Sequence, residues 1–194
     1  HTVLINTGGF DDAELKAIED RAYELGSAKH ANLTILDKYY DKAIKYLIFG
    51  NVLKNNTYPL SVSAERVFQA IEAIKYAKSV GATAIAHGST GAGNDQIRFD
   101  LIFQTIAPEI EIITPIRDLK LSRQEEVDYL AKNGVHYSWE KAQYSINKGL
   151  WGTSVGGKET LTSSQPLPSE AYPSQLQKEG EVKVSLEFLK GELV

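Results

Sequence analysis

The sequence contains no cysteine. This absence excludes disulfide bonds, zinc sites with thiolate ligands and cysteine nucleophiles. No apolar run approaches the about 20 residues needed to cross a bilayer, and no signal-peptide pattern opens the chain. No basic tract accompanies the net charge of −4, so neither nucleic acid nor a membrane is expected as a partner. These absences predict a cytoplasmic protein.

The remaining composition is that of a globular protein. The chain has 194 residues, of which 42% are hydrophobic and 24% charged. Because domains contain about 100–200 residues each, this length allows one sizeable core or two small ones.

Strand and helix patterns alternate over residues 1–134. Such alternation predicts a parallel sheet with helices on both faces and with ligands at the carboxyl ends of the strands. Ser122 and Glu125 form a capping-box pattern at the start of the last helix. The expected strands are 1–6, 33–37, 82–86 and 110–114, and the expected helices are 11–26, 37–50, 63–81, 95–106 and 123–132.

The pattern changes after about residue 135. Aromatic, glycine and proline residues become more frequent and helical periodicity fades, which predicts a second domain over 135–194. Two strands are expected around the Lys190-Gly191 turn. The proline-bearing stretch 163–180 has the composition of a linker.

Residues 81–100 carry the clearest signal of a binding site. A short apolar strand leads into a glycine-rich turn and then into a helix that Asn94 or Asp95 can cap. Free N–H groups at that helix start attract an anion, and Thr90, Asn94, Asp95 and Arg98 add polar and charged groups. An amino acid requires this mixture, because its carboxylate needs donors and its ammonium needs an acceptor. An ordinary capped strand-to-helix connection is the alternative.

Four segments resemble the argininosuccinate synthase family. HGSTGAGNDQIR (87–98) resembles the family's loop that binds aspartate and citrulline. NNTYPLSVSAER (55–66), ITPIRDLKLSRQEEVDYL (113–130) and YSINKGLWGTSVGGKETL (144–161) also match, in the family's order. The resemblance covers nearly the whole chain. It implies a doubly wound, adenine nucleotide alpha hydrolase-like domain over 1–134 and the first part of an α+β synthetase domain over 135–194, with 163–180 as an ordered crossing segment.

The resemblance also implies an activity and its residues. The family joins citrulline and aspartate into argininosuccinate through a citrullyl-AMP intermediate and releases AMP and pyrophosphate. ATP with Mg²⁺ and a homotetramer are implied as well, whereas no metal ligand and no catalytic side chain is assigned. The implied contacts are Asn6 and Gly88 for ATP; Thr90, Asn94 and Asp95 for aspartate; and Tyr58, Ser63, Asn94, Arg98, Ser145 and Ser154 for citrulline.

Several of these residues have simpler explanations. Ser63 can be a helix cap, Ser145 and Ser154 can be solvated loop serines, and His87 is more often structural than catalytic at a strand end. Two other functions also stay open. One is a related adenylating ligase, which would lack the 144–161 motif, and the other is a non-catalytic nucleotide-binding module.

One departure from the family concerns the pyrophosphate loop. No SGGLDTS-type segment occurs, and TGGF (7–10) resembles the end of the family's next strand. We therefore expect that the chain begins about one strand late and stops before the family's second domain ends. On this interpretation the 194-residue chain alone forms no AMP from ATP.

Overall fold

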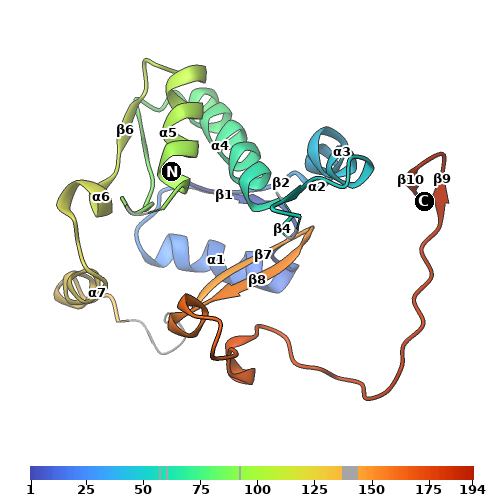
Figure 1. Cartoon of the computed structure of the whole chain (residues 1–194). Helices are drawn as coiled ribbons and strands as arrows, with labels where there is room; N and C mark the ends of the chain where they lie inside the picture. The colour runs from blue at the N-terminus through green and yellow to red at the C-terminus, as the bar shows by residue number, and fades with distance from the viewer. Residues whose placement is uncertain (57, 60, 92, 137–143) are drawn as a thin grey trace.

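The computed structural model describes residues 1–56, 58–59, 61–91, 93–136 and 144–194. The side chains of six further residues lie outside the description, namely Lys54, Tyr58, Pro59, Ser61, Val62 and Arg123. The first 136 residues form an α/β unit, and a β-hairpin and a long extended segment follow (Figure 1).

The chain opens with two parallel strands connected by a helix. Strand β1 (Thr2–Asn6) pairs with β2 (His30–Thr34), and Thr2 lies opposite His30. Helix α1 (Asp12–Glu24) begins with a capping box of Asp11 and Glu14. It lies on one face of the β1–β2 pair, and helix α4 covers the other face (Figure 1). This arrangement agrees with helices on both faces.

The prediction of a strand over 33–37 is wrong by three residues, because β2 lies earlier, at His30–Thr34. The second half of 33–37 instead begins a helical segment made of α2 (Leu36–Tyr39), the π-helical turn η1 (Tyr40–Ile44) and α3 (Lys45–Phe49). The reason is that β2 starts to pair with β1 directly after the turn that follows α1, so the strand begins at His30. A short antiparallel pair, β3 (Leu53–Lys54) and β4 (Tyr58–Pro59), then leads to α4.

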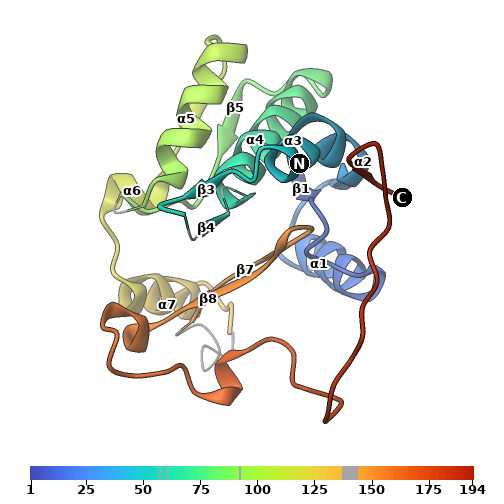
Figure 2. The same ribbon diagram turned by 45° about the vertical axis from the view of Figure 1, so that its right-hand side comes forward.

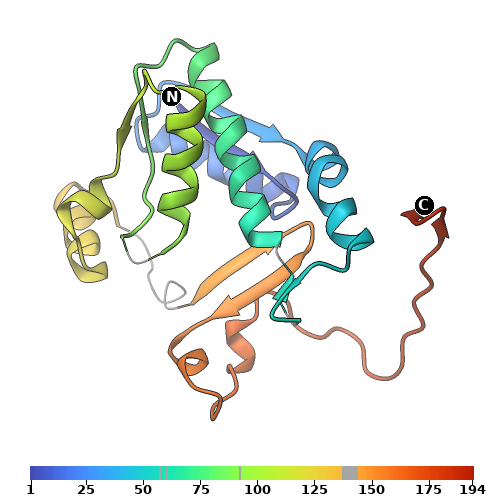
Figure 3. The ribbon, with the colours of Figure 1, turned by 45° about the horizontal axis from the view of Figure 1, so that its top comes forward.

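The main core lies between two neighbouring helices and a second parallel strand pair. Helix α4 (Ser61–Ser79) packs along α5 (Asp95–Ile106), as Figure 3 shows. Strand β5 (Ala84–Ala86) pairs in parallel with β6 (Glu111–Ile113). The buried members of this core are Ala70, Ile74, Ala77, Phe103, Ala107 and Ile110.

The single continuous sheet expected from the alternation is not formed. No hydrogen-bonded ladder joins β1 to β5 among the described residues, so the two parallel pairs stay separate. Two cavities of about 310 and 300 Å³ lie between them, both lined by β1, by β5 and by Ala73 of α4. Pairing is a non-local event that periodicity in one segment does not encode.

Two helices close the α/β unit. Helix α6 (Pro115–Leu119), which was not predicted, ends at Lys120 with a positive φ of 53°. Helix α7 (Arg123–Lys132) has the predicted bounds, and Ser122 and Glu125 form the predicted capping box. Across the described residues no helix has the length and apolar character needed to span a membrane.

The last part of the chain contains little regular structure. Strands β7 (Ser145–Gly149) and β8 (Gly152–Gly156) form a hairpin, which was not predicted. Two short 3₁₀ turns follow, η2 (Lys158–Leu161) and η3 (Ser169–Ala171). An extended segment then runs away from the rest of the chain to β9 (Phe188–Leu189) and β10 (Glu192–Leu193), as Figure 2 shows. These two strands pair around Lys190-Gly191 as predicted, over two residues each.

Candidate functional site

The glycine-rich turn after β5 leads into an uncapped helix. Asn94 is the N-cap of α5, but its side chain makes no capping hydrogen bond. The N–H groups of the first turn therefore face a potential anion without a side-chain acceptor. Thr90 and Asn94 are exposed, and no hydrogen bond of either side chain occurs within the described part of the chain. Both side chains are thus available to a ligand.

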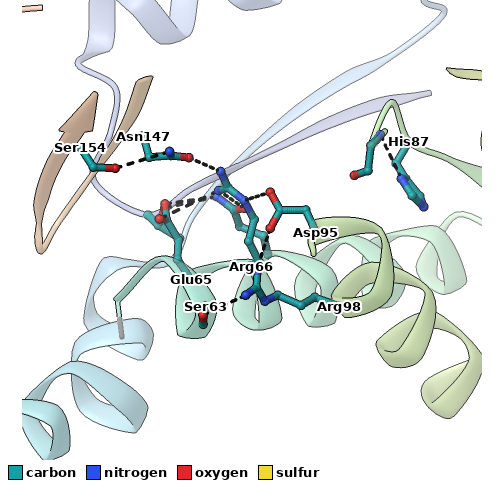
Figure 4. Close-up of polar contacts among 11 residues, drawn as sticks. Ser63, Glu65, Arg66, His87, Asp95, Arg98, Asn147 and Ser154 are labelled. Atoms are coloured by element: carbon teal, nitrogen blue, oxygen red, sulfur yellow. Dashed lines mark hydrogen bonds and ion pairs between the residues drawn. The ribbon is translucent and has the colours of Figure 1, made fainter. Parts of the chain in front are cut away.

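Asp95 lies between two arginines at the start of α5. Its Oδ2 accepts a hydrogen bond from Nε of Arg66 at 3.1 Å, and its Oδ1 accepts one from Nη1 of Arg98 at 2.7 Å (Figure 4). Arg66 was not singled out from the sequence. One signal for it was available in the sequence. Arg66 lies one helical turn after Ser63, so both residues share one face of α4.

Arg98 has a protein partner for its inward charge. Besides the contact with Asp95, its Nη2 donates to Oγ of Ser63 at 3.0 Å. Arg98 therefore has a carboxylate partner within the protein. The hydrogen bond from Nη2 brings Ser63 of α4 and Arg98 of α5 together.

The β7–β8 hairpin brings a third element to this cluster. Nη2 of Arg66 donates to Oδ1 of Asn147 at 2.9 Å, and Nδ2 of Asn147 lies 3.5 Å from Oγ of Ser154, as Figure 4 shows. Asn147 and Ser154 are opposite each other in the hairpin. Ser145 shares their face because side chains two residues apart on a strand point the same way. The hairpin thus places both predicted serines on the side of the arginines.

The hairpin turn is held against the loop after β1. The N–H of Leu150 donates to the carbonyl of Thr7 at 3.0 Å. A Cβ atom at Gly9 would lie 2.2 Å from the carbonyl oxygen of Lys148, so only glycine allows this approach. The hairpin turn therefore lies beside Thr7, whose hydroxyl donates a hydrogen bond to Glu65 of α4.

A buried carboxylate lies beside the cluster. Glu65 is 7% exposed, accepts a hydrogen bond from the Thr7 hydroxyl and one from Gln69 at 3.4 Å, and lies 4.0 Å from Nη1 of Arg66. Two arginines and two carboxylates therefore meet here with balanced charge. Such a site offers both signs side by side, as the ammonium and carboxylate of an amino acid require.

Asn6 and Gly88 lie at the carboxyl ends of β1 and β5. The Asn6 side chain is buried and shapes its own loop, because Oδ1 accepts from the N–H of Gly8 at 2.9 Å and Nδ2 donates to the carbonyl of Phe10 at 3.4 Å. Gly88 is exposed in the turn. Their contact with ATP stays a prediction, and the side chain of Tyr58 lies outside the described residues.

His87 belongs to a polar network behind the turn. Its Nε2 lies 2.9 Å from Oδ1 of Asp100, whose Oδ2 accepts from Nη1 of Arg117 at 2.5 Å. Burial acts to raise the pKa of the Asp100 carboxyl, but the hydrogen bonds and charges of Arg117 and His87 outweigh it and lower that pKa. These contacts favour the structural role of His87.

The described side chains provide no metal centre. No group of three His, Asp or Glu residues in the described ranges could hold an ion. Mg²⁺ usually takes one or two carboxylates together with substrate phosphates, so it needs no cage made of protein ligands alone. A bound Mg²⁺ stays a prediction.

Comparisons with known proteins identify the family of the chain. Residues 2–136 match the family described as the arginosuccinate synthase N-terminal HUP domain. The argininosuccinate synthases of Sulfolobus acidocaldarius and Saccharolobus solfataricus are both 37% identical to the chain, over 191 and 192 residues. Each alignment covers 98% of this chain and 48% of the relative. That of Methanocaldococcus jannaschii is 36% identical over 186 residues, 94% of this chain and 47% of the relative.

The chain spans about half the length of the curated relatives it matches. Within that half, the family match covers the whole α/β unit, and the relatives align through the hairpin and the extended segment as well. The chain belongs to the argininosuccinate synthase family.

Proposed function

We propose that the protein contributes to the ATP-dependent ligation of citrulline and aspartate into argininosuccinate, with release of AMP and pyrophosphate. The observation that carries this proposal is the Arg66–Asp95–Arg98 contact at the uncapped start of α5. It combines donors for a carboxylate with an acceptor for an ammonium group. The family membership supports the same reaction.

The residues divide into three sets by the group that each set would contact. Thr90 and Asn94 would donate to the aspartate carboxylates, and Asp95 would accept from its ammonium. Arg98 would hold the citrulline carboxylate. The full citrulline set is Tyr58, Ser63, Asn94, Arg98, Ser145 and Ser154, and Asn6 and Gly88 would border ATP.

The reaction requires little covalent work from the protein. The ureido oxygen of citrulline attacks the α-phosphorus of ATP and pyrophosphate leaves, which gives citrullyl-AMP. The aspartate amine then attacks the activated carbon, AMP leaves and the amine loses a proton. Positioned donors and charges are the main source of acceleration in such steps. The cluster of amide, hydroxyl and guanidinium groups supplies these.

Citrulline-dependent pyrophosphate release tests this proposal. We expect the full-length protein to release pyrophosphate from ATP with citrulline and to form argininosuccinate when aspartate is added. Mass spectrometry of the product and a coupled pyrophosphate assay measure both steps. ATP binding with no product under any combination of the amino acids would favour a non-catalytic nucleotide-binding module instead.

Replacing Arg98 by lysine tests the citrulline contact. Lysine keeps the charge but loses the planar fork, so one charged hydrogen bond is lost. We expect the citrulline KM of the full-length enzyme to rise roughly tenfold while the ATP KM changes little. Steady-state kinetics with each substrate varied in turn measures this. Equal damage to all three substrates would show that Arg98 supports the fold only.

We also infer that the two parallel strand pairs, which no ladder joins over the residues that the structure describes, become parts of one doubly wound sheet when a further strand lies between them. Both pairs pack on α4, and the cavities between β1 and β5 leave room for a further strand. The synthetase domain over 135–194, the homotetramer, the cytoplasmic location and the use of Mg²⁺ remain predictions from the family resemblance.

A further inference from the structure

Arg66 connects three elements that are distant in sequence. Its Nε donates to Asp95 at the start of α5, its Nη1 donates to Gln69 on its own helix at 2.9 Å, and its Nη2 donates to Asn147 on β7. The side chain is 20% exposed, so these hydrogen bonds compete with little water. The orientation of the guanidinium therefore depends on these three acceptors.

The hydrogen bonds of Arg66 are part of a longer series that extends in two directions from its guanidinium. Figure 4 shows the contacts that run from Ser154 through Asn147 and Arg66 to Asp95, and from there through Arg98 to Ser63. We call these six residues the arginine network. In the proposed function its ends, Ser154 and Ser63, contact citrulline, while Asp95 in its middle contacts aspartate.

We propose that Arg66 is a positioning residue that couples the binding of the two amino acids. The proposal rests on the proposed function for the identity of the ligands. Citrulline on the hairpin orders Ser154 and Asn147, Asn147 orients the guanidinium of Arg66, and Arg66 holds the carboxylate of Asp95 toward the aspartate ammonium. Binding of either amino acid thereby pre-organises the other site, and the effect is reciprocal.

The fork geometry of arginine is essential to this role. Three acceptors from three elements are met by separate N–H groups of one planar group. A lysine ammonium at this position keeps the charge but cannot span the same acceptors in one plane. Arg66→Lys therefore tests whether the coupling needs the fork geometry of arginine or only its positive charge.

Isothermal titration calorimetry of the full-length enzyme tests the proposal. The Kd of aspartate is measured with and without saturating citrulline, and that of citrulline with and without aspartate, with a non-hydrolysable ATP analogue present throughout. The variants are Arg66→Lys, Asn147→Ala and their combination. Lys75→Gln is the matched control, because Lys75 lies on the same helix, is exposed and pairs with Glu72.

We expect each amino acid to tighten the binding of the other about tenfold in the wild type and in Lys75→Gln, within the usual range of such couplings. In Arg66→Lys and in Asn147→Ala this factor falls to about one. The double variant shows no further loss, because both residues act in one series. Arg66→Lys could also lower the thermal midpoint of unfolding. In that case Asn147→Ala tests the coupling, since it removes only the acceptor that the hairpin offers to Arg66.

The outcomes separate the two proposals. Wild-type protein that binds neither amino acid contradicts the proposed function. Wild-type protein that binds both amino acids without coupling overturns the inference about Arg66 and leaves the function intact. Retention of the coupling factor in both single variants also overturns it and shows that Arg66 only supports the fold.

Discussion

Asp95→Asn in the full-length enzyme should raise the aspartate KM by about 10- to 150-fold. The change keeps the shape of the side chain but removes the charge that would accept the ammonium, and a hydrogen bond to a charged group contributes roughly 1.5–3 kcal/mol. The same carboxylate also holds Arg66 and Arg98. The citrulline KM should therefore rise as well, by a smaller factor.

Initial-rate kinetics with aspartate, citrulline and ATP varied in turn measures these effects. Asp128→Asn is the control, since Asp128 is exposed on α7 and accepts only a local hydrogen bond from Gln124 at 2.8 Å in the described structure. Its three KM values should match the wild type. An unchanged aspartate KM and kcat in Asp95→Asn would remove Asp95 from the site.

Phe103→Ala should lower the free energy of unfolding by about 3–5 kcal/mol, because it removes a large side chain from a packed core. Phe103 is 2% exposed and lies in the main core with Ile74 and Ile110. Its ring centroid is 5.8 Å from that of Phe99 and 6.1 Å from that of His87, so the cavity would also loosen the strand end that precedes Gly88. Urea unfolding followed by circular dichroism measures the loss.

Leu101→Ala provides the comparison for this change. Leu101 lies on the same helix, two residues earlier, and is 61% exposed. Its replacement should alter stability by less than about 0.5 kcal/mol. Equal losses in both variants would mean that helix propensity rather than burial sets the stability of α5.

Local features of the fold could be predicted where the sequence carries its own start and stop signals. Helices α5 and α7 have the predicted bounds, and the capping box at Ser122 is formed. Gly26 adopts a positive φ of 90° just beyond α1, as a residue that ends a helix does. In each case the determining contacts lie within one or two turns of the residue concerned.

Strand β2 and the sheet could not be predicted in the same way. The apolar run 33–37 has strand-like residues, but β2 lies at His30–Thr34 because its register depends on β1. Likewise, no local pattern indicates that the two strand pairs are separate. A strand's position is decided by its partner, which local patterning does not name.

For the candidate site, the amino-acid sequence was enough to predict the chemistry of one loop. Residues 87–98 contain glycines, a hydroxyl, an amide, a carboxylate and a guanidinium within one short segment. That spacing sufficed to predict an amino-acid site, because neighbours on a helix must lie near one another. The contact of Arg66 with Asn147, 81 residues further along the chain, became visible only in the tertiary structure. Contacts at such separation follow from how the hairpin and α4 pack together, and no local spacing encodes that packing.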